Sequence, residues 1–433
     1  MVMFSSWGNL KKEPHVIKEF NLASKFEKYL EEGKTILPLG NGRSYGDVCT
    51  NSNNILLHSA NLSNFVALDT KNDTLTLEAG IILKDIQRFL VPLGYMLPIT
   101  PGTELITVGG AIANDVHCKN HHKFGTFGNN VVSFTLMRSD GEILECSREQ
   151  NEGFFKATIG GIGLTGIILR ATLKLRHVNG CLIDAENVPY KTLDEFYQIA
   201  KDSEEGFEHT VAWIDCITGN GERGIFMRGN NADDKVSYDI NKSIGVPFTS
   251  PFSLVNKLSL YGFNQMYYKM QTLKKRKFKV HYEKFFYPLD GILNWNRIYG
   301  PKGFFQYQCV VPFENGFEAI KEIQKTIAKS GQGSFLGVLK TFGDIKSLGF
   351  LSFPRPGFTY ALDFPNQGAK TLELFASLDE IVRSAKGRLY LAKDARQPRA
   401  LFEEGYGLDN INEFLKYRDP KFSSDLSRRL LGV

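Results

Sequence analysis

The chain has 433 residues, 42% hydrophobic and 23% charged, which is a composition typical of soluble globular proteins and not of disordered or fibrous ones. Its formal net charge of +5 is small for this length and gives no argument for nucleic-acid binding. The length exceeds what one hydrophobic core usually organises, so we expect two domains.

The spacing of the cysteines and the length of the apolar runs indicate in which compartment the protein occurs. The six cysteines are widely spaced and include no C-x-x-C pair, which excludes a disulfide framework or a zinc ribbon and favours a reducing compartment. The first 14 residues lack the apolar core of a signal peptide, and no apolar run approaches the ~20 residues that span a bilayer. We therefore expect a cytoplasmic protein.

The first half of the chain alternates helical and strand patterns. Residues 15–33 have the apolar spacing of an amphipathic helix, and 35–39 read as a buried strand. A hairpin is predicted for 66–78, and 82–93 have helical spacing that stops at Gly94. A second hairpin is predicted for 131–147.

Three glycine-rich stretches stand beside predicted strands. They are PLGNGRSYGD (38–47), TVGGAIAN (107–114) and GGIGLTG (160–166). The first does not fit the dinucleotide fingerprint, which needs glycine where Tyr45 stands, nor the Walker pattern, which needs a Gly-Lys pair. Each stretch alone is also explained as a tight turn. Together they indicate several backbone segments that approach one extended ligand.

The second half has another character. After about residue 180 glycine becomes rarer, while aromatic residues and lysines increase. From 388 onward the pattern of a compact domain returns.

The motifs resemble a known family. GNGRSYGD (40–47), PGTELITVGGAIANDVHCKNHHKFGTFGNN (101–130) and GGIGLTGIIL (160–169) resemble the FAD-binding domain of the vanillyl-alcohol oxidase and p-cresol methylhydroxylase (PCMH) superfamily. Within it, the members that oxidise a polyprenylphosphoryl ribose are the most similar over YPLDGILNWNRIYGPKGFFQYQCVVP (287–312), SFLGVLKTFG (334–343), LDFP (362–365) and GRLYLAKDAR (387–396).

This resemblance implies an α+β, two-domain architecture. Residues 1–178 would form a PCMH-type FAD-binding domain of two α/β subdomains. Residues 179–387 would form a substrate-binding domain with an antiparallel sheet flanked by helices, and 388–433 would return to the FAD-binding domain.

FAD is the implied cofactor. Glycines at 42 and 46 let successive backbone amides converge on a pyrophosphate, with Arg43 and Ser44 as further donors. Many relatives attach the flavin through a histidine after this Arg-Ser pair. Here Tyr45-Gly46-Asp47 follows, so we expect non-covalent FAD. The cofactor-binding residues implied by the resemblance are Gly42, Arg43, Ser44, Tyr45, Gly46, Pro101, Gly102, Thr103, Gly109, Gly110, Ala113, Asn114, His117, Asn120, Gly125, Gly163, Ile167 and Tyr390.

The implied chemistry is oxidation of a secondary alcohol, with the proton leaving to a base. The resemblance makes His117, Lys393 and Tyr45 the catalytic candidates, and it assigns the substrate to Gln306, Gln308, Lys340 and Lys393. Without the resemblance, Tyr45, Gln306, Gln308, Lys340 and Tyr390 are equally well explained as ordinary polar residues of a β-sheet, and Lys393 as a surface lysine at a strand end.

A zinc site is the rival interpretation of the histidines. His117 and His121 are four residues apart beside Cys118, but a zincin would have glutamate at 118, and no third ligand is evident. We expect no metal, and we expect His121 and His122 to order the loop.

Two features bear on substrate identity. Thr359 and Ala361 stand where those relatives carry asparagine and cysteine, so we expect inhibitors that capture that cysteine not to cross-link here. The segment 254–279 mixes aromatic residues with a dense basic run. It is either an interfacial element that meets anionic lipid headgroups or a solvated basic helix that closes the pocket.

The resemblance implies oxidation of the 2-hydroxyl of a polyprenylphosphoryl-β-D-ribose to the 2-keto sugar, the first half of a 2-epimerisation to the arabinose form. An NAD(P)H-dependent short-chain reductase would act on the keto product, and quinone is a suitable electron acceptor. The protein would be cytoplasmic and peripheral at the inner face of the plasma membrane, without a nucleic-acid partner. The alternatives are oxidation of a soluble sugar alcohol, aldonolactone or nucleotide sugar, or a non-catalytic lipid-binding protein on a flavin fold.

Overall fold

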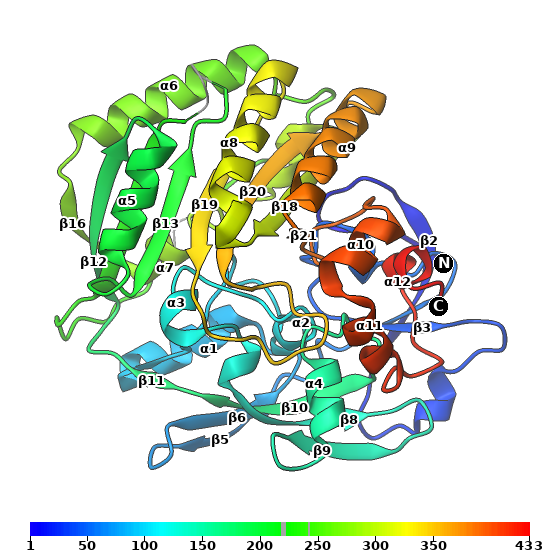
Figure 1. The fold of residues 1–433 in the computed structure, drawn as a ribbon. Helices are drawn as coiled ribbons and strands as arrows, with labels where there is room; N and C mark the ends of the chain where they lie inside the picture. The colour runs from blue at the N-terminus through cyan, green and yellow to red at the C-terminus, as the bar shows by residue number, and fades with distance from the viewer. Residues whose placement is uncertain (218–221, 241–242) are drawn as a thin grey trace.

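The computed structural model describes residues 1–217, 222–240 and 243–433. Within these ranges, three larger sheets form the framework of an α+β fold, as predicted, and helices cover the outer face of the largest sheet (Figure 1).

The first sheet contains the strand that precedes the first glycine-rich stretch. Its order is β1-β2-β4-β3, with β1 at Val2–Phe4, β2 at Glu13–Glu19, β3 at Ile36–Leu39 and β4 at Ile55–His58. Both β2 and β3 run parallel to β4, which lies between them. The strand β3 delivers the chain into the loop at residue 40.

The helix predicted for 15–33 is wrong. This stretch forms β2 and a short 3-10 helix, η1 (Phe26–Tyr29), because Val16 and Ile17 pair with β4 while Phe20, Phe26 and Tyr29 are buried beneath the sheet. The apolar residues of 15–33 are three or four positions apart, which is also the spacing on one face of a helix. Pairing with β4, whose residues are 39 positions further along the chain, makes this segment a strand.

The second sheet has the order β5-β6-β10-β8-β9. Both hairpins predicted from the sequence are confirmed: β5 (Phe65–Asp69) pairs with β6 (Thr74–Glu78), and β8 (Val131–Met137) with β9 (Ile143–Ser147). The strand β10 (Ile167–Lys174) follows the third glycine-rich stretch and lies between β6 and β8.

The helix predicted for 82–93 is confirmed as α1 (Leu83–Leu90), continued by the 3-10 helix η3 (Val91–Leu93). It ends at Gly94, whose φ of 82° is left-handed. Short elements complete this half of the chain: η2 (Asp47–Cys49), β7 (Tyr95–Met96), α2 (Val108–Ala113), α3 (His121–Phe124), η4 (Gly128–Asn130), α4 (Glu152–Thr158) and β11 (Arg176–His177).

The third sheet is antiparallel, with the order β16-β12-β14-β13-β19-β20-β18-β21. Its strands are β12 (Leu182–Tyr190), β13 (His209–Ile214), β14 (Gly224–Asn231), β16 (Lys277–His281), β18 (Phe304–Val311), β19 (Gly337–Phe342), β20 (Gly357–Pro365) and β21 (Arg388–Leu389). The sheet takes in β21, just past the predicted domain boundary at 387. The boundaries at 178 and 387 stay predictions.

The two faces of this sheet differ in chemistry. Side chains such as Tyr307, Cys309 and Tyr360 pack under α5 (Leu193–Ser203), α8 (Phe313–Ser330) and α9 (Ala369–Ser384). Because neighbouring side chains of a strand point to opposite faces, their sequence neighbours turn the other way. These are the polar or small residues Gln306, Gln308, Thr359, Ala361 and Asp363, and they line a cavity.

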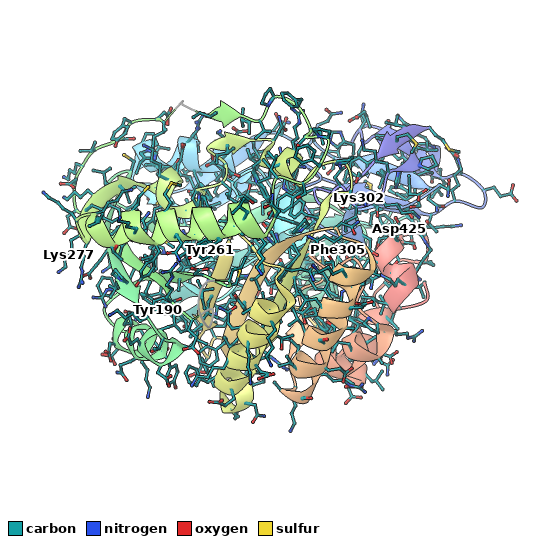
Figure 2. The ribbon with its side chains drawn as sticks, turned by 90° about the horizontal axis from the view of Figure 1, so that it is seen from above. Tyr190, Tyr261, Lys277, Lys302, Phe305 and Asp425 are labelled. Carbon is teal, nitrogen blue, oxygen red and sulfur yellow. The ribbon has the colours of Figure 1, made fainter. Side chains whose placement is uncertain are left out.

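The helix α6 (Lys257–Leu273) contacts β12 and β14 and lines the same cavity. Seen from above, it lies apart from α8 and α9, with Tyr261 on it (Figure 2). The remaining elements nearby are α7 (Tyr282–Phe286), β15 (Ile244–Gly245), β17 (Ile292–Leu293) and η5 (Trp295–Tyr299).

The last part of the chain packs against the first sheet. It forms α10 (Arg399–Tyr406), α11 (Leu408–Leu415) and α12 (Asp425–Leu430). The amide of Ile36 in β3 donates to the carbonyl of Lys421 (2.8 Å), and the amide of Ser423 donates to the carbonyl of Ile36 (3.0 Å). Among the described helices, none is both long and apolar enough to cross a membrane.

Candidate active site

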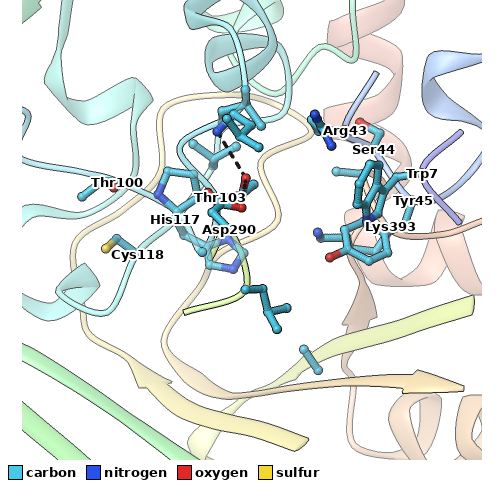
Figure 3. A pocket seen from close by; sticks show the side chains of 18 of the residues that line it. Trp7, Arg43, Ser44, Tyr45, Thr100, Thr103, His117, Cys118, Asp290 and Lys393 are labelled. Carbon is cyan, nitrogen blue, oxygen red and sulfur yellow. Dashed lines mark hydrogen bonds between the residues drawn. The ribbon is translucent and has the colours of Figure 1, made fainter. Parts of the chain in front are cut away.

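A cavity of about 1070 Å³ lies between the glycine-rich stretches and the polar face of the third sheet (Figure 3). Most of the residues predicted for cofactor, substrate or catalysis line it. They are Gly42, Arg43, Ser44, Tyr45, Pro101, Gly102, Thr103, Gly109, Gly110, Ala113, Asn114, His117, Gly163, Ile167, Gln306, Gln308, Lys340, Tyr390 and Lys393.

Three predicted cofactor residues lie outside this lining. Gly46 packs against Asp394, where an added Cβ would meet the carbonyl oxygen at 1.6 Å. Asn120 is buried and donates to the carbonyl of Pro98 (2.9 Å), and Gly125 ends α3 with a φ of 71°. All three shape the loops around the cavity.

The loop after β3 presents free backbone donors. Gly42 has a left-handed φ of 59°, which turns the chain sharply. The amides of Gly42, Arg43 and Ser44 have no acceptor among the described residues, whereas the Tyr45 amide donates to Ala392 (3.2 Å) and holds the loop. Consecutive unpaired amides in such a turn form an anion nest, so the loop fits a diphosphate.

Arg43 adds positive charge beside these amides. Its guanidinium lies 4.4 Å from the ring centre of Trp7, and its buried Nε has no partner among the described residues. Burial lowers the pKa of Arg43, while the carboxylate of Asp290 opposes that shift. Asp290 is held by the Thr103 hydroxyl (2.9 Å) and the Glu104 amide (2.8 Å). The side chain keeps donors available for an anionic ligand.

His117 sits in an aromatic enclosure made by Phe342, Phe353 and Tyr390, at ring-centre distances of 4.9, 5.5 and 5.2 Å. Burial, and then the charge of Lys340, hold its pKa well below the usual value, so the ring is neutral. The amide nitrogen of Gln308 donates to its Nε2 (3.0 Å). The ring proton is therefore on Nδ1, which is buried and has no partner among the described residues.

Tyr390 joins this enclosure to the second glycine-rich stretch. Its hydroxyl donates to the carbonyl of Asn114 (2.8 Å), and burial raises its pKa, so it stays protonated. The side-chain amide of Asn114 donates to Gly110 (2.9 Å), which leaves its buried Oδ1 without a donor in the described chain. That oxygen can accept a hydrogen bond from a group in the cavity.

Lys393, Tyr45 and Asp363 form a second cluster across the cavity. The Lys393 ammonium lies 3.7 Å from the ring centre of Tyr45, and Figure 3 shows these two beside Trp7, Arg43 and Ser44. Burial lowers the pKa of Lys393, and the Asp363 carboxylate opposes that shift. Burial likewise raises the pKa of Asp363, so the charged forms of both groups are disfavoured.

Asp363 is anchored by one oxygen and free at the other. Gln306 Nε2 donates to Oδ1 (2.5 Å), and the backbone amide of Asp363 donates to the Ser334 hydroxyl (3.0 Å). Oδ2 is buried and accepts no hydrogen bond from the described residues. A proton on this carboxyl or a hydroxyl from a ligand would satisfy it.

Two further lysines line the cavity near His117. Lys340 donates to the carbonyl of Cys118 (3.1 Å), and Lys119 to that of Phe285. Burial lowers the pKa of each to about 8. Both remain largely cationic at neutral pH and attract a phosphate.

His121 and His122 begin α3 and do not line the cavity. His121 packs on Phe342 at 4.6 Å, and burial lowers its pKa to about 3. His122 donates from Nε2 to the carbonyl of Phe207 (2.9 Å). These contacts tie α3 to neighbouring segments.

Sequence reasoning missed Asp363, Asp290 and Trp7 as parts of the site. The two aspartates stood in stretches that carried the family resemblance, LDFP and YPLDG, and that was the available signal. Trp7 had none, because its contact with Arg43 joins segments that belong to different elements. Thr359 and Ala361 both line the cavity, and Gln308 donates to the Thr359 hydroxyl (3.3 Å).

Comparison with known proteins agrees with this geometry. Residues 16–147 match the model of an FAD binding domain family. The chain is 35% identical to decaprenylphosphoryl-beta-D-ribose oxidase of Mycolicibacterium smegmatis, over 92% of this chain and 90% of that protein. It is 32% identical to mouse (Mus musculus) L-gulonolactone oxidase over 33% of this chain and 32% of the relative. It is 23% identical to D-arabinono-1,4-lactone oxidase of Eremothecium gossypii over 70% of this chain and 57% of the relative.

Proposed function

Because the chain belongs to the vanillyl-alcohol oxidase and PCMH family of FAD-dependent oxidoreductases, we propose that it oxidises the 2-hydroxyl of a polyprenylphosphoryl-β-D-ribose to the 2-keto sugar. The observation that carries the proposal is the continuity of one cavity. It joins the anion nest at Gly42–Ser44 to a buried chamber that holds His117, Lys393 and two glutamine amides.

Lys393 is our candidate for taking the hydroxyl proton. Its lowered pKa makes the neutral amine accessible near neutral pH, and a neutral amine can accept a proton from an alcohol. When FAD is bound, it supplies the acceptor for the hydride of the carbon that bears this hydroxyl. Tyr45, whose phenol burial keeps protonated, positions the lysine through its ring.

The amides of Gln306 and Gln308 and the ring of His117 suit a sugar. Gln308 is oriented by His117 and Gln306 by Asp363, so both side-chain amides are fixed where they can contact sugar hydroxyls. The unpaired Nδ1–H of His117 is a further donor. Lys340 and Lys119, on the same side as His117, would bind the phosphodiester.

The same proposal includes the partners and the location. The FAD would be non-covalent, because Tyr45-Gly46-Asp47 offers no histidine for attachment. A quinone would reoxidise it, and an NAD(P)H-dependent short-chain reductase would reduce the keto product to complete an epimerisation to arabinose. The protein would act at the inner face of the plasma membrane.

Anaerobic bleaching of the flavin tests the substrate assignment. Purified protein is mixed without oxygen with polyprenylphosphoryl ribose, and loss of flavin absorbance is followed by stopped flow. We expect rapid bleaching and a 2-keto sugar by mass spectrometry.

The relatives that are named for lactones define the contrary result. Bleaching by a free alditol or by L-gulono- or D-arabinono-lactone, with none by the lipid-linked ribose, would favour a lactone or polyol oxidase instead. Release of intact FAD after acid precipitation checks that the cofactor is not covalently attached.

A further inference from the structure

The helix α6 has two apolar faces, and the described protein covers one of them. Its inner face is fixed by Phe263 on Phe335 (4.8 Å), by Tyr267 on Trp213 (4.7 Å) and by buried Asn264. Phe263 and Tyr267 also line the cavity. This face accounts for the fold of the helix and for its place beside the site.

The outer face is open to solvent and exposes large apolar side chains next to polar ones such as Lys269 and Thr272. It carries Leu258 and Leu273, which are 82% and 77% exposed, together with half-exposed side chains. We call this set the α6 surface: Leu254, Leu258, Tyr261, Met266, Met270 and Leu273. Leu254 lies just before the helix and the other five lie on it, so a helix of about 25 Å exposes several large apolar side chains, which is unfavourable in water and marks an interaction surface.

The stretch of sequence that contains the α6 surface carries charges of one sign. Residues 240–282 contain eight Lys or Arg and no Asp or Glu, so the rest of the chain has more acidic than basic residues. Four of these cations, 274–277, follow the helix directly, are exposed and form no ion pair among the described residues. An apolar helix face beside an uncompensated basic cluster is complementary to anionic lipid headgroups over an acyl layer.

The cavity opens beside this surface. Lys274, Lys275 and Phe278 are exposed and line the cavity, and so do Ile292 and Leu293 of β17. The mouth thus combines cations with exposed apolar side chains, at the end of α6 where the basic cluster begins. If a bound ligand has a long lipid chain, that chain can leave the cavity here without entering water only where the acyl layer of a membrane lies outside.

We propose that the α6 surface docks on an anionic lipid bilayer, with residues 274–277 on the headgroups and the cavity mouth facing the acyl layer. The docking itself is independent of the substrate. Its use, delivery of a polyprenyl chain to the site, rests on the proposed function.

Vesicle co-sedimentation of the intact flavoprotein tests the docking. Vesicles of phosphatidylglycerol and phosphatidylethanolamine should pellet the protein at low salt, and vesicles of phosphatidylcholine should pellet far less. Each basic residue near an anionic surface contributes a factor of about five, so Arg276→Ser with Lys277→Ser should weaken binding about 25-fold. Leu258→Ser with Leu273→Ser should weaken it about tenfold or more.

The control substitutions lie on α8 and α11, outside the α6 surface. Lys325→Ser with Lys329→Ser on α8, and Leu408→Ser on α11, also remove exposed side chains and should leave vesicle binding unchanged. Flavin absorbance and melting temperature verify that each variant is folded. Equal binding to both lipid compositions, binding unaffected by both α6 variants, or a lipid-independent dimer that these variants dissociate would overturn the proposal.

A short-chain, water-soluble phosphoribose separates the docking from the catalysis. The α6 variants should bleach with this substrate as fast as the parent protein, and slower only with the long-chain substrate in vesicles. If no phosphoribose bleaches the flavin but vesicle binding follows the expected pattern, the substrate assignment fails and the docking stands.

Discussion

Arg429 on α12 donates two hydrogen bonds, each of 2.9 Å, to the carboxylate of Asp47 in the first glycine-rich loop, 382 positions earlier in the chain. It also donates to Asp394 (2.8 Å), the neighbour of Lys393. One guanidinium therefore fixes the loop that presents the anion nest against the strand end that presents the candidate base. Burial acts to lower the pKa of Arg429, but the combined attraction of Asp394 and Asp47 outweighs it and raises the pKa, so the clamp is cationic throughout the physiological range.

Arg429→Ala should destabilise the protein and weaken FAD binding. The substitution removes the cationic partner of the buried Asp394 and of the half-buried Asp47, which costs about 3 kcal/mol in the free energy of unfolding. Thermal melts and flavin retention on gel filtration measure the effect. Arg399→Ala is the control, because that exposed side chain pairs with Glu403 and contributes below about 0.5 kcal/mol. Equal melting temperatures for the two variants would contradict the clamp.

Gly46→Ala should abolish flavin binding without touching the cavity lining. The new Cβ would stand 1.6 Å from the Asp394 carbonyl, so the loop must move. We expect a loss of at least about 3 kcal/mol in stability and colourless protein. Gly206→Ala is the matched control, since that glycine has open space around it. A yellow, stable Gly46→Ala protein would show that the loop tolerates displacement.

The rate of anaerobic flavin reduction should rise with pH and level off below the pH at which an ordinary lysine titrates. Burial lowers the pKa of Lys393, and the neutral amine is the form that takes a proton, so the active fraction increases as pH rises through that pKa. Lys393→Met should remove this rise of the rate with pH, which is the acid limb of the pH profile, and should slow reduction about 10²–10⁴-fold. A parent rate that falls over the same range would instead make the ammonium the active form.

Asp363→Asn should shift the acid limb of that profile to lower pH. The Asp363 carboxylate raises the pKa of Lys393 by attraction, so an amide, which still accepts from Gln306, allows the lysine to lose its proton more readily. Asp290→Asn removes a carboxylate that lines the same cavity but does not act on Lys393, and it should leave the limb in place. A limb that moves equally in both variants would assign the effect to net charge.

Local sequence patterns predicted secondary structure correctly where the pairing strands are neighbours in the sequence. The hairpin at β8 and β9 was predicted because alternating apolar residues flank Ser139-Asp140-Gly141, which turns the chain within three residues. The stretch 15–33 failed for the opposite reason. Its strand β2 forms by pairing with β4, and no residue pattern within 15–33 indicates that pairing.

The candidate site divides in the same way. The glycines at 42 and 46 and the residues His117, Lys393 and Gln308 stand in motifs that the family resemblance marks. Asp363 was within such a motif but was passed over, because an aspartate on a strand has no distinguishing pattern. Its importance comes from burial and from its charge on Lys393, which only the fold creates.

The sequence by itself determined the cofactor class through the resemblance of its three glycine-rich stretches to an FAD-binding domain, because backbone that approaches a diphosphate closely needs glycine. It also determined the family, since the motifs run along nearly the whole chain. The tertiary structure alone decided which groups share one electrostatic environment: Lys393 with Asp363, and Arg429 with Asp47 and Asp394. Coulomb interactions and desolvation depend on distance and burial in space, and sequence separation carries neither.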